Sequence, residues 1–534
     1  MAEFDVVVAG GTVVDGTGSA PRTADVAIKD GRIAEVGEVR GTATRTIDAD
    51  GALVTPGFVD IHTHYDGQAT WDSFLAPSSW HGVTTVVMGN CGVGFAPVRP
   101  ADHQRLIELM EGVEDIPGAA LHEGLSWEWE SFPEYLDALE RRPHDIDLAA
   151  QVPHGAVRLN VMGERGANRE VATPEEIERM GAIVREAVAA GALGFTTSRT
   201  LNHRTSRGEP TPTLTAAADE LVGIAAAMGD AGVLEVVSDF TDFDAEVKML
   251  RQMVEQSGRP LSISVAARNN KDEGIALLDL IGQMASGGLP IKGQVPARAI
   301  GILLGLEATL NPFVGHETYK EVAHLPLAER VALMGDVSFR ERLLAEERQK
   351  RSGLFKFVGY DRMFELGDPP NYEPEPSESV AARAQREGRA PEELAYDLML
   401  ADGGKRLLYS PIFNYAEGSL DGAREMLLHE YSVPGLADGG AHVGTICDGS
   451  FPTTLLAHWC RDRTRGEKLD VEFVVRAQCR ETAEVVGLTD RGMLAPGMKA
   501  DLNVIDLDNV GLHDPEMHFD LTEGGKRLLK RAAG

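Results

Sequence analysis

Two histidines separated by one residue, His62 and His64, end an apolar run that starts at Pro56. Residues two apart in an extended strand point to the same side, so both imidazoles would face the same space. Neutral imidazole nitrogens at this spacing can bind one divalent metal ion. The alternative is a pair of buried histidines bonded to the backbone, but two adjacent rings would each need partners of their own. We therefore predict that His62 and His64 are metal ligands.

Two further side chains have the chemistry that such a site needs. Asp438 lies between apolar Leu436-Ala437 and two glycines. Its carboxylate could bind the metal and exchange protons with a bound water, or it could cap the next helix. Cys91 ends another apolar run, where a cation would hold it as a thiolate; the alternative is a small buried thiol. We predict Asp438 as a catalytic residue and ligand, and Cys91 as a ligand.

A polar, basic cluster that contains Arg199 and His203 follows a later apolar segment of this acidic chain. An arginine fork suits a carboxylate, so we predict a small-molecule substrate that carries one; a solvated loop is the alternative. Asn90 and His154 could orient a substrate carbonyl or could satisfy backbone groups. His442, which follows Asp438, could support the ligands from behind.

Eight apolar segments, most of them short and followed by a helical or loop stretch, run through the middle of the chain. They are Leu53–His64, Thr84–Asn90, Asp147–Pro153, Ala192–Thr197, Val233–Asp239, Leu261–Ala267, Pro290–Val295 and Gly435–Asp438. Helical patterns lie between several of them, for example 174–190 with Thr173 as N-cap. Eight such units predict an α/β fold, a TIM-like (β/α)₈ barrel whose catalytic residues lie at the carboxyl ends of the strands. A doubly wound sheet is the alternative, but no GxGxxG motif follows the first strand.

The two ends of the chain predict a smaller unit. Residues 1–55 are short β-type runs separated by tight turns, and β-type sequence returns after Gly492. We expect 1–55 and 492–534 to form a small β-sandwich module, with a closing helix over 526–533, and 56–491 to form the barrel. The connection over 297–434 is far too long for one helix. We expect it to be a long helical insertion between strands seven and eight that covers the barrel mouth.

Composition narrows the classes of partner. The chain has 534 residues and a formal net charge of −32, from 51 Lys and Arg against 83 Asp and Glu. A surface this acidic repels phosphate backbones and anionic lipid, so we expect no nucleic-acid or membrane partner. Four cysteines are too few for a disulfide scaffold. Acids at Glu3 and Asp5 stand where a signal peptide would carry basic charge, so we expect a cytoplasmic protein. Its oligomeric state, a homo-oligomer included, stays open.

The motifs resemble those of the amidohydrolase superfamily. Residues 51–66 look like its strand-one metal motif, and Gly492–Gly497 looks like its C-terminal β-module signature. The N-acyl-D-amino-acid deacylase (D-aminoacylase) branch is more similar still. Its strand-two motif, whose cysteine binds zinc, resembles Thr84–Gly92, and its strand-eight turn with the catalytic aspartate resembles Ala437–Gly439. Further similar stretches lie at 152–155 and 191–198.

That branch also places metal-binding histidines at the ends of strands five and six, and both are missing here. The two strands read Val233–Asp239 and Leu261–Arg268, and no histidine lies between His203 and His316. Strand four has no lysine for a carbamylated bridge. The half-site that remains can hold one metal, with Asp239 as a replacement for the strand-five histidine.

Resemblance and half-site together imply a metal-dependent hydrolase of a C–N bond, with an amide in an N-acylated amino acid or similar compound as the expected substrate. A divalent cation, expected to be one Zn²⁺, would activate water. Asp438 would take the proton and deliver it to the leaving nitrogen. Two alternatives stay open: a cyclic amide or imide hydrolase on the same half-site, and a metal-free homologue that binds a ligand without chemistry.

Overall fold

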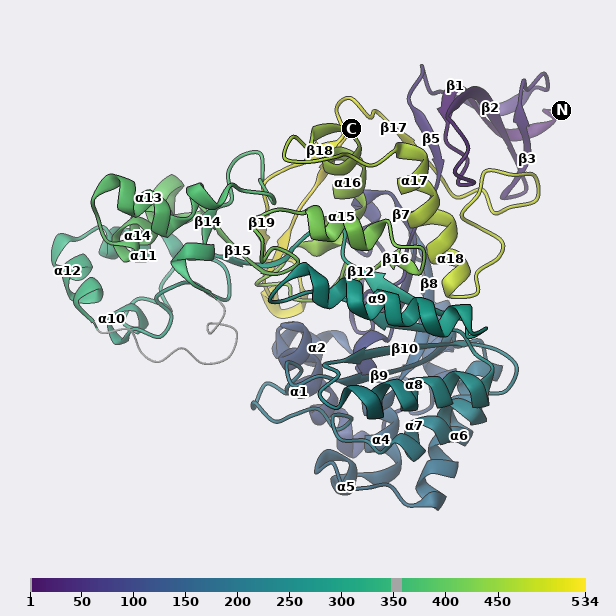
Figure 1. The fold of residues 1–534 in the computed structure, drawn as a ribbon, viewed down its shortest axis with the longest axis horizontal. Helices are drawn as coiled ribbons and strands as arrows, with labels where there is room; N and C mark the ends of the chain where they lie inside the picture. The colour runs from purple at the N-terminus through teal and green to yellow at the C-terminus, as the bar shows by residue number, and fades with distance from the viewer. Residues whose placement is uncertain (1, 347–357) are drawn as a thin grey trace.

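A parallel sheet of eight strands forms the centre of the computed structural model, which describes residues 2–346 and 358–534 (Figure 1). Its strands are β6 Phe58–Asp60, β7 Val83–Met88, β8 Asp147–Pro153, β9 Gly194–Arg199, β10 Val233–Ser238, β11 Leu261–Ser264, β12 Ile291–Val295 and β16 Ser432–Pro434. They follow one another in chain order across the sheet, from β6 to β16. The sheet is curled and TIM-like, as the eight apolar segments predicted.

The two edge strands are linked beyond their carboxyl ends. An isolated parallel bridge pairs Thr63 with Gly439. The amide of His64 donates to the carbonyl of Gly439 at 2.8 Å, and the amide of Asp438 donates to the carbonyl of His62 at 3.0 Å. These bonds place the residues after β6 beside the residues after β16, which brings the two predicted histidines next to Asp438.

Helices connect the strands and pack around the sheet. Those that belong to the barrel are α1 His103–Glu114, α2 Gly118–Gly124, α3 Phe132–Glu140, α4 His154–Met162, α5 Glu164–Ala167, α6 Pro174–Ala189, α7 Ala218–Ala227, α8 Phe243–Ser257, α9 Lys271–Ser286, α15 Asp421–Leu427, α16 Phe451–Thr454, α17 Val471–Val475 and α18 Thr482–Val485. Helix α6 confirms the predicted start, because Thr173 and Glu176 form a capping box before Pro174. In Figure 1, α6, α7 and α8 lie together on one side of the sheet.

Both ends of the chain contribute to a second sheet of six strands, at the top right of Figure 1. Its strands are β1 Phe4–Val13, β2 Arg22–Lys29, β3 Arg32–Gly37, β4 Ala43–Asp48, β5 Leu53–Pro56 and β17 Leu502–Ile505. Since β5 pairs with β1 and β17, the segment that we expected to be the first barrel strand is divided. Its first part belongs to the small module, and only β6 belongs to the barrel.

The last residues differ from the prediction. Residues 511–533 form two short antiparallel pairs, β18 Gly511–Leu512 with β21 Ala532–Ala533 and β19 Glu516–His518 with β20 Arg527–Leu529. The helix predicted over 526–533 was therefore wrong. Leu528 is buried against the chain's interior and its amide donates to the carbonyl of Val443, so tertiary packing overrides local propensity. The eighth barrel strand also ends at Pro434, just before the predicted segment.

Most of the predicted insertion forms a lobe with its own hydrophobic core, which Figure 1 shows to the left of the barrel. It contains β13 Ile300–Leu304, β14 Phe364–Glu365, β15 Leu408–Phe413, α10 Glu317–Lys320, α11 Leu327–Met334, α12 Val337–Ala345, α13 Val380–Glu387 and α14 Pro391–Gly404. The lobe is attached near the carboxyl ends of barrel strands. There the backbone amide of Asn414 donates to the carbonyl of Ala267, and that of Thr309 donates to the carbonyl of Gly444. That it covers the barrel mouth stays a prediction, and its residues 347–357 lie outside the described residues.

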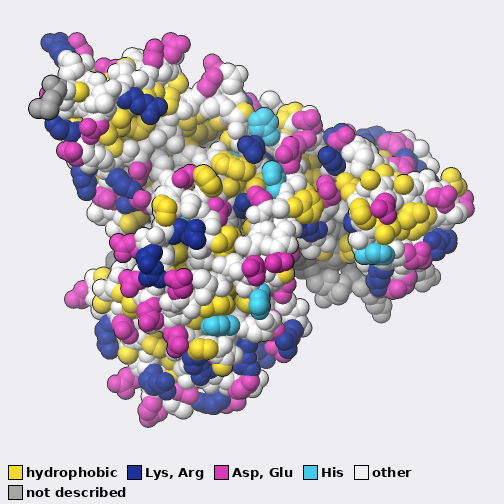
Figure 2. Space-filling model, turned by 180° about the vertical axis from the view of Figure 1, so that it is seen from behind, with side chains coloured by type: hydrophobic (Ala, Val, Ile, Leu, Met, Phe, Trp, Pro, Cys, Tyr) yellow, Lys and Arg dark blue, Asp and Glu magenta, His cyan; other side chains and the backbone are white. Residues whose placement is uncertain are grey.

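On the face shown in Figure 2, acidic and basic side chains are interspersed. Among the described residues, no helix combines the length and the apolar character that crossing a membrane requires. The expected localisation and the expected lack of a nucleic-acid partner stay predictions.

Candidate metal centre

Three predicted ligands lie together where β6 and β7 end. The ligand atoms of His62, His64 and Cys91 all lie within 4.8 Å of one another, and all three side chains are buried. Nε2 of His62 is 3.3 Å from Sγ of Cys91, and the two imidazole centroids are 5.5 Å apart. Two imidazole nitrogens and a sulfur are a donor set that a divalent cation such as zinc accepts.

Asp438 completes this group from the other edge of the sheet. Its Oδ1 lies 3.5 Å from Nε2 of His62 and 3.7 Å from Nε2 of His64. Both Asp438, with φ of 49°, and Cys91, with φ of 56°, occupy the left-handed backbone region that non-glycine residues rarely adopt. The backbone therefore turns sharply at two of the four side chains that meet here, as it often does at functional sites.

A second set of contacts orients His62. Its Nδ1 lies 2.9 Å from Oε1 of Gln294 on β12, and the amide of Gln294 donates in turn to the hydroxyl of Ser262 at 2.8 Å. Because an amide oxygen only accepts, the proton of His62 is on Nδ1. The lone pair of Nε2 is thereby directed at Cys91 and Asp438, which is the arrangement that a metal ligand requires.

Glu114, the last residue of α1, lies beside Nδ1 of His64, as Gln294 lies beside Nδ1 of His62. Its Oε1 lies 3.4 Å from Nδ1 of His64, and its Oε2 lies 3.6 Å from Nε2 of His442. Nε2 of His442 is also 3.9 Å from Oδ2 of Asp438, and a supporting role of His442 toward the ligands stays a prediction. Nothing in the sequence marked Glu114, which ends an ordinary amphipathic helix far from the strand motifs.

On strand five (β10), Glu235 contacts the cluster, whereas the predicted Asp239 does not. The amide of Cys91 donates to Oε2 of Glu235 at 3.2 Å, and the hydroxyl of Ser264 on strand six lies 3.4 Å from Oε1. Asp239 instead accepts from the hydroxyl of Thr200 and the amide of Leu201. A carboxylate within the apolar stretch Val233–Val237 was the signal that could have identified Glu235.

Burial and charge set the protonation of the cluster. Burial lowers the pKa of His62 to about 4. Burial alone would lower the pKa of His64 too, but the carboxylates of Glu114 and Asp438 raise it to about 9. Burial would raise the pKa of Asp438, but the hydrogen bond with His64 and the charges of His62 and His442 hold it well below its usual range. Burial and then Glu235 raise the pKa of the Cys91 thiol. A cation would have to displace protons from His64 and Cys91.

Glu235 itself is 1% exposed, and burial raises the pKa of its carboxyl to about 8. Its remaining contacts are the amide and the hydroxyl described above. These two contacts connect the carboxyl of Glu235 to the turn at Cys91 and to strand six.

His203, one of the residues predicted to touch substrate, is close enough to the cluster for its charges to act on the imidazole. Its Nδ1 is 2.8 Å from the hydroxyl of Ser198. Burial, and then the positive charges of His442 and His64, lower the pKa of His203 to about 3. The side chain therefore shares the electrostatic environment of the metal centre.

Two other predicted residues, Arg199 and His154, have structural partners outside the cluster. The guanidinium of Arg199 is bound to Glu246 on α8, with Nε 2.8 Å from Oε1, and to the carbonyl of Ala216. His154 lies between the hydroxyl of Thr197 and the carboxylate of Glu220, each at 2.8 Å. A role for either in binding substrate stays a prediction.

Asn90, next to Cys91, spans the strand ends. Its amide nitrogen donates to the carbonyls of Thr63 and Val87, and its oxygen accepts from the amide of Gln151. These bonds link the residues after β6 to those after β7. They agree with the alternative that Asn90 satisfies backbone groups. Contact with a substrate carbonyl stays a prediction.

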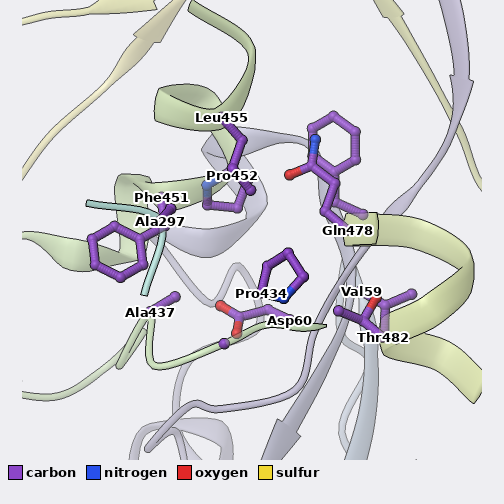
Figure 3. A pocket seen from close by; sticks show the side chains of 12 residues that line it. Val59, Asp60, Ala297, Pro434, Ala437, Phe451, Pro452, Leu455, Gln478 and Thr482 are labelled. Carbon is purple, nitrogen blue, oxygen red and sulfur yellow. The ribbon is translucent and has the colours of Figure 1, made fainter. Parts of the chain in front are cut away.

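A small cavity of about 30 Å³ lies beside the first and last barrel strands (Figure 3). Asp60 and Gln478 both line it, and Oδ2 of Asp60 and both polar atoms of the Gln478 amide are buried with no hydrogen-bond partner among the described residues. The other oxygen of Asp60 accepts from the amide of His62 at 3.2 Å. A space of this size holds a water molecule or two, which would satisfy these atoms.

Comparisons with known proteins identify the family of this chain. A family model described as "Amidohydrolase family" matches residues 45–524. D-aminoacylase of Alcaligenes xylosoxydans xylosoxydans is 37% identical over 195 residues, which are 36% of this chain and only 37% of that protein's length. N-acyl-D-glutamate deacylase of the same organism is 28% identical over 513 residues, 95% of this chain and 88% of that one.

Solved structures show the shared fold. The crystal structure of N-acyl-D-glutamate deacylase from Bordetella bronchiseptica, complexed with zinc and a phosphonate inhibitor, superimposes with a TM-score of 0.63 at 24% identity and covers 99% of this chain and 94% of that one. A structure of D-aminoacylase gives a TM-score of 0.62. The chain belongs to the amidohydrolase family, in its branch of D-aminoacylases and N-acyl-D-amino-acid deacylases.

Proposed function

We propose that this protein is a metal-dependent amidohydrolase that removes the acyl group from an N-acylated amino acid or a similar compound. The observation that carries the proposal is the group of His62, His64, Cys91 and Asp438, whose ligand atoms meet at the ends of the first, second and last barrel strands. The names of the relatives, D-aminoacylase and N-acyl-D-glutamate deacylase, support an amide substrate.

The four side chains fit one zinc ion, which the imidazoles of His62 and His64, the sulfur of Cys91 and the carboxylate of Asp438 would hold. A bound zinc ion supplies a Lewis acid for the substrate carbonyl and lowers the pKa of a bound water. Asp438 is the group that takes the proton from the attacking water and gives it to the leaving nitrogen. The hydrogen bond with His64 and the charges of the neighbouring histidines keep this carboxylate ionised, as a group that accepts a proton must be.

A substrate carboxylate would be recognised by the segment that follows β9. Arg199, the last residue of β9, is the cation that we favour for the carboxylate, and His203 is the second candidate. Because Arg199 is paired with Glu246, binding would require this ion pair to open, with the substrate carboxylate in the place of Glu246.

A cyclic amide or imide is the second candidate substrate. Glu235, Ser262 and Ser264 stand on the two strands where the deacylases that this chain resembles carry metal-binding histidines. This change in the site favours a different substrate on the same ligands.

A panel of substrates separates these reactions. The zinc-loaded protein is incubated with paired D and L N-acyl amino acids, with hydantoins and with cyclic imides, and free amino acid is quantified. We expect release from at least one N-acyl amino acid. Hydrolysis of the cyclic compounds alone would favour the second candidate. A protein that binds zinc but cleaves neither class would refute the proposal and leave a ligand-binding homologue.

A further inference from the structure

Glu114 lies in a place that is costly for a carboxylate. It is 1% exposed, and an ionised carboxylate out of contact with water is destabilising unless it is paired. It is also the last residue of α1, where unpaired backbone carbonyls carry partial negative charge and disfavour another anion. Burial and the helix C-terminus both disfavour the carboxylate of Glu114, so it needs partner side chains of opposite charge that offset these two effects.

Those partners are two histidines that also face Asp438. Glu114 approaches Nδ1 of His64 at 3.4 Å and Nε2 of His442 at 3.6 Å. Asp438 approaches Nε2 of His64 at 3.7 Å and Nε2 of His442 at 3.9 Å. The four side chains therefore form a closed ring in which carboxylates and imidazoles alternate, and His64 belongs both to this ring and to the metal centre.

Two atoms on the inner side of the ring are without a hydrogen bond. Nδ1 of His64 and Oε1 of Glu114 are both buried, and neither has a hydrogen-bond partner among the described residues. They face each other at 3.4 Å, so each is the natural partner of the other. The equivalent atom of His62 already has such a partner, because its Nδ1 lies 2.9 Å from Gln294.

The backbone holds Glu114 in this place independently of its side chain. The amide of His442 donates to the carbonyl of Glu114, and the hydroxyl of Thr445 donates to Asp115 at 3.1 Å. The end of α1 is thus attached to the loop that follows the last barrel strand. Glu114 reaches from this junction to a ligand that lies at the end of the first strand.

We propose that Glu114 is a positioning residue, which accepts a hydrogen bond from Nδ1–H of His64 and so directs the lone pair of Nε2 toward Cys91 and Asp438. The inference rests on the proposed function in one respect, that the centre binds a metal. It assigns no proton transfer to Glu114.

The test compares zinc dissociation constants, measured by competition with a chromophoric chelator. Glu114→Leu keeps the size of the side chain and removes the acceptor, while Glu114→Gln keeps a neutral acceptor. Loss of a hydrogen-bond partner of a ligating histidine weakens metal binding by about 10–100-fold, so we expect this loss for the leucine variant and a smaller loss for the glutamine variant. The absorption spectrum of the Co²⁺-loaded leucine variant should change as well.

Glu373→Gln is the matched control. Glu373 is another buried carboxylate that pairs with a histidine, His458 at 3.0 Å, but it lies outside the metal centre. This variant should lose stability and keep a zinc dissociation constant within about twofold of the parent. A folded Glu114→Leu protein that binds zinc as tightly as the parent would overturn the inference. Should that variant fail to fold, Glu114→Ala removes the same acceptor, and zinc affinity that is unchanged in Glu114→Ala would overturn the inference equally.

The measurement separates this inference from the proposed function. If the parent binds zinc and cleaves no amide, the proposed function fails, and the dissociation constants still decide the role of Glu114. If the parent binds zinc and cleaves its substrate but Glu114→Leu binds zinc normally, only the inference about Glu114 fails.

Discussion

Nδ1 of His62 lies 2.9 Å from the side-chain oxygen of Gln294, although β6, which His62 follows, and β12, which carries Gln294, are six positions apart in the sheet order. The contact crosses the barrel interior, since His62 follows β6 and Gln294 is on β12. It determines which nitrogen of His62 carries the proton. A residue on the seventh barrel strand, β12, therefore orients a candidate metal ligand that follows the first strand, β6.

Removal of this contact should weaken metal binding. Gln294→Leu leaves Nδ1 of His62 without an acceptor, and we expect the zinc dissociation constant to rise by about 10–100-fold. Chelator competition measures the change. Ser262→Ala removes only the hydroxyl that accepts from Gln294, so its effect should be smaller. Equal effects of the two variants, or none for Gln294→Leu, would show that the contact does not orient His62.

Cys91 should be needed for affinity rather than for folding. Cys91→Ala removes one donor atom, and we expect the zinc dissociation constant to rise by at least about tenfold while the free energy of unfolding changes by about 1 kcal/mol or less. Cys460→Ala is the control, because Cys460 is partly buried beside Asp470 and Glu472 and outside the cluster. If Cys460→Ala weakened zinc binding and Cys91→Ala did not, the assignment of Cys91 as a ligand would be contradicted.

Asp438 should be needed for turnover more than for structure. Asp438→Asn keeps the size of the side chain and an oxygen near the two histidines, but it cannot accept the proton of the attacking water. We expect the variant to retain its fold and most of its metal and to lose about 10²–10⁴-fold in kcat. Circular dichroism, zinc content and kcat are measured on the same preparation. Undiminished kcat would refute the role in proton transfer.

Acid stability should depend on Glu373, which is buried among cationic partners. Burial would raise the pKa of its carboxyl, but hydrogen bonds from His458 and Arg463 lower it from 4.5 to about 2. A pKa that is lower in the folded state stabilises the fold above the unfolded value, and this contribution is lost as the pH falls from 4.5 to about 2. With allowance for solvent screening, we expect about 2 kcal/mol.

Urea unfolding at several pH values checks this prediction. Glu373→Gln should be less stable than the parent at neutral pH, and the difference between the two should shrink below pH 4.5. Glu378→Gln is the control, because Glu378 pairs with Arg386 on the surface, where both side chains are more than half exposed. A difference between parent and Glu373→Gln that stays constant across this pH range would contradict the assigned pKa.

The strand motifs made part of this centre predictable from the sequence. His62 and His64 follow from spacing alone, because a period of two places both rings on one side of a strand. Asp438 and Cys91 follow from their places after apolar runs, since the carboxyl ends of barrel strands meet in one region. Each of these residues reaches the centre through its own local sequence, which is why local patterns identify it.

The remaining members of the centre reach it through tertiary packing. Glu114 comes from the end of a helix whose position depends on contacts with the loop after the last strand. Arg199 was expected to face substrate, but α8 places Glu246 against it, and no local pattern announces that pair. The predicted helix over 526–533 failed for the same reason, because its residues pair with β18 and β19 instead.

The zinc content of the protein tests the central claim most directly. Elemental analysis is carried out after incubation with zinc and removal of the excess, on the parent and on the double variant His62→Ala/His64→Ala. We expect about one equivalent of zinc per chain in the parent and less than about a tenth of an equivalent in the double variant. A parent that retains less than about a tenth of an equivalent, or a double variant that retains as much as the parent, would contradict a metal centre built on these two histidines.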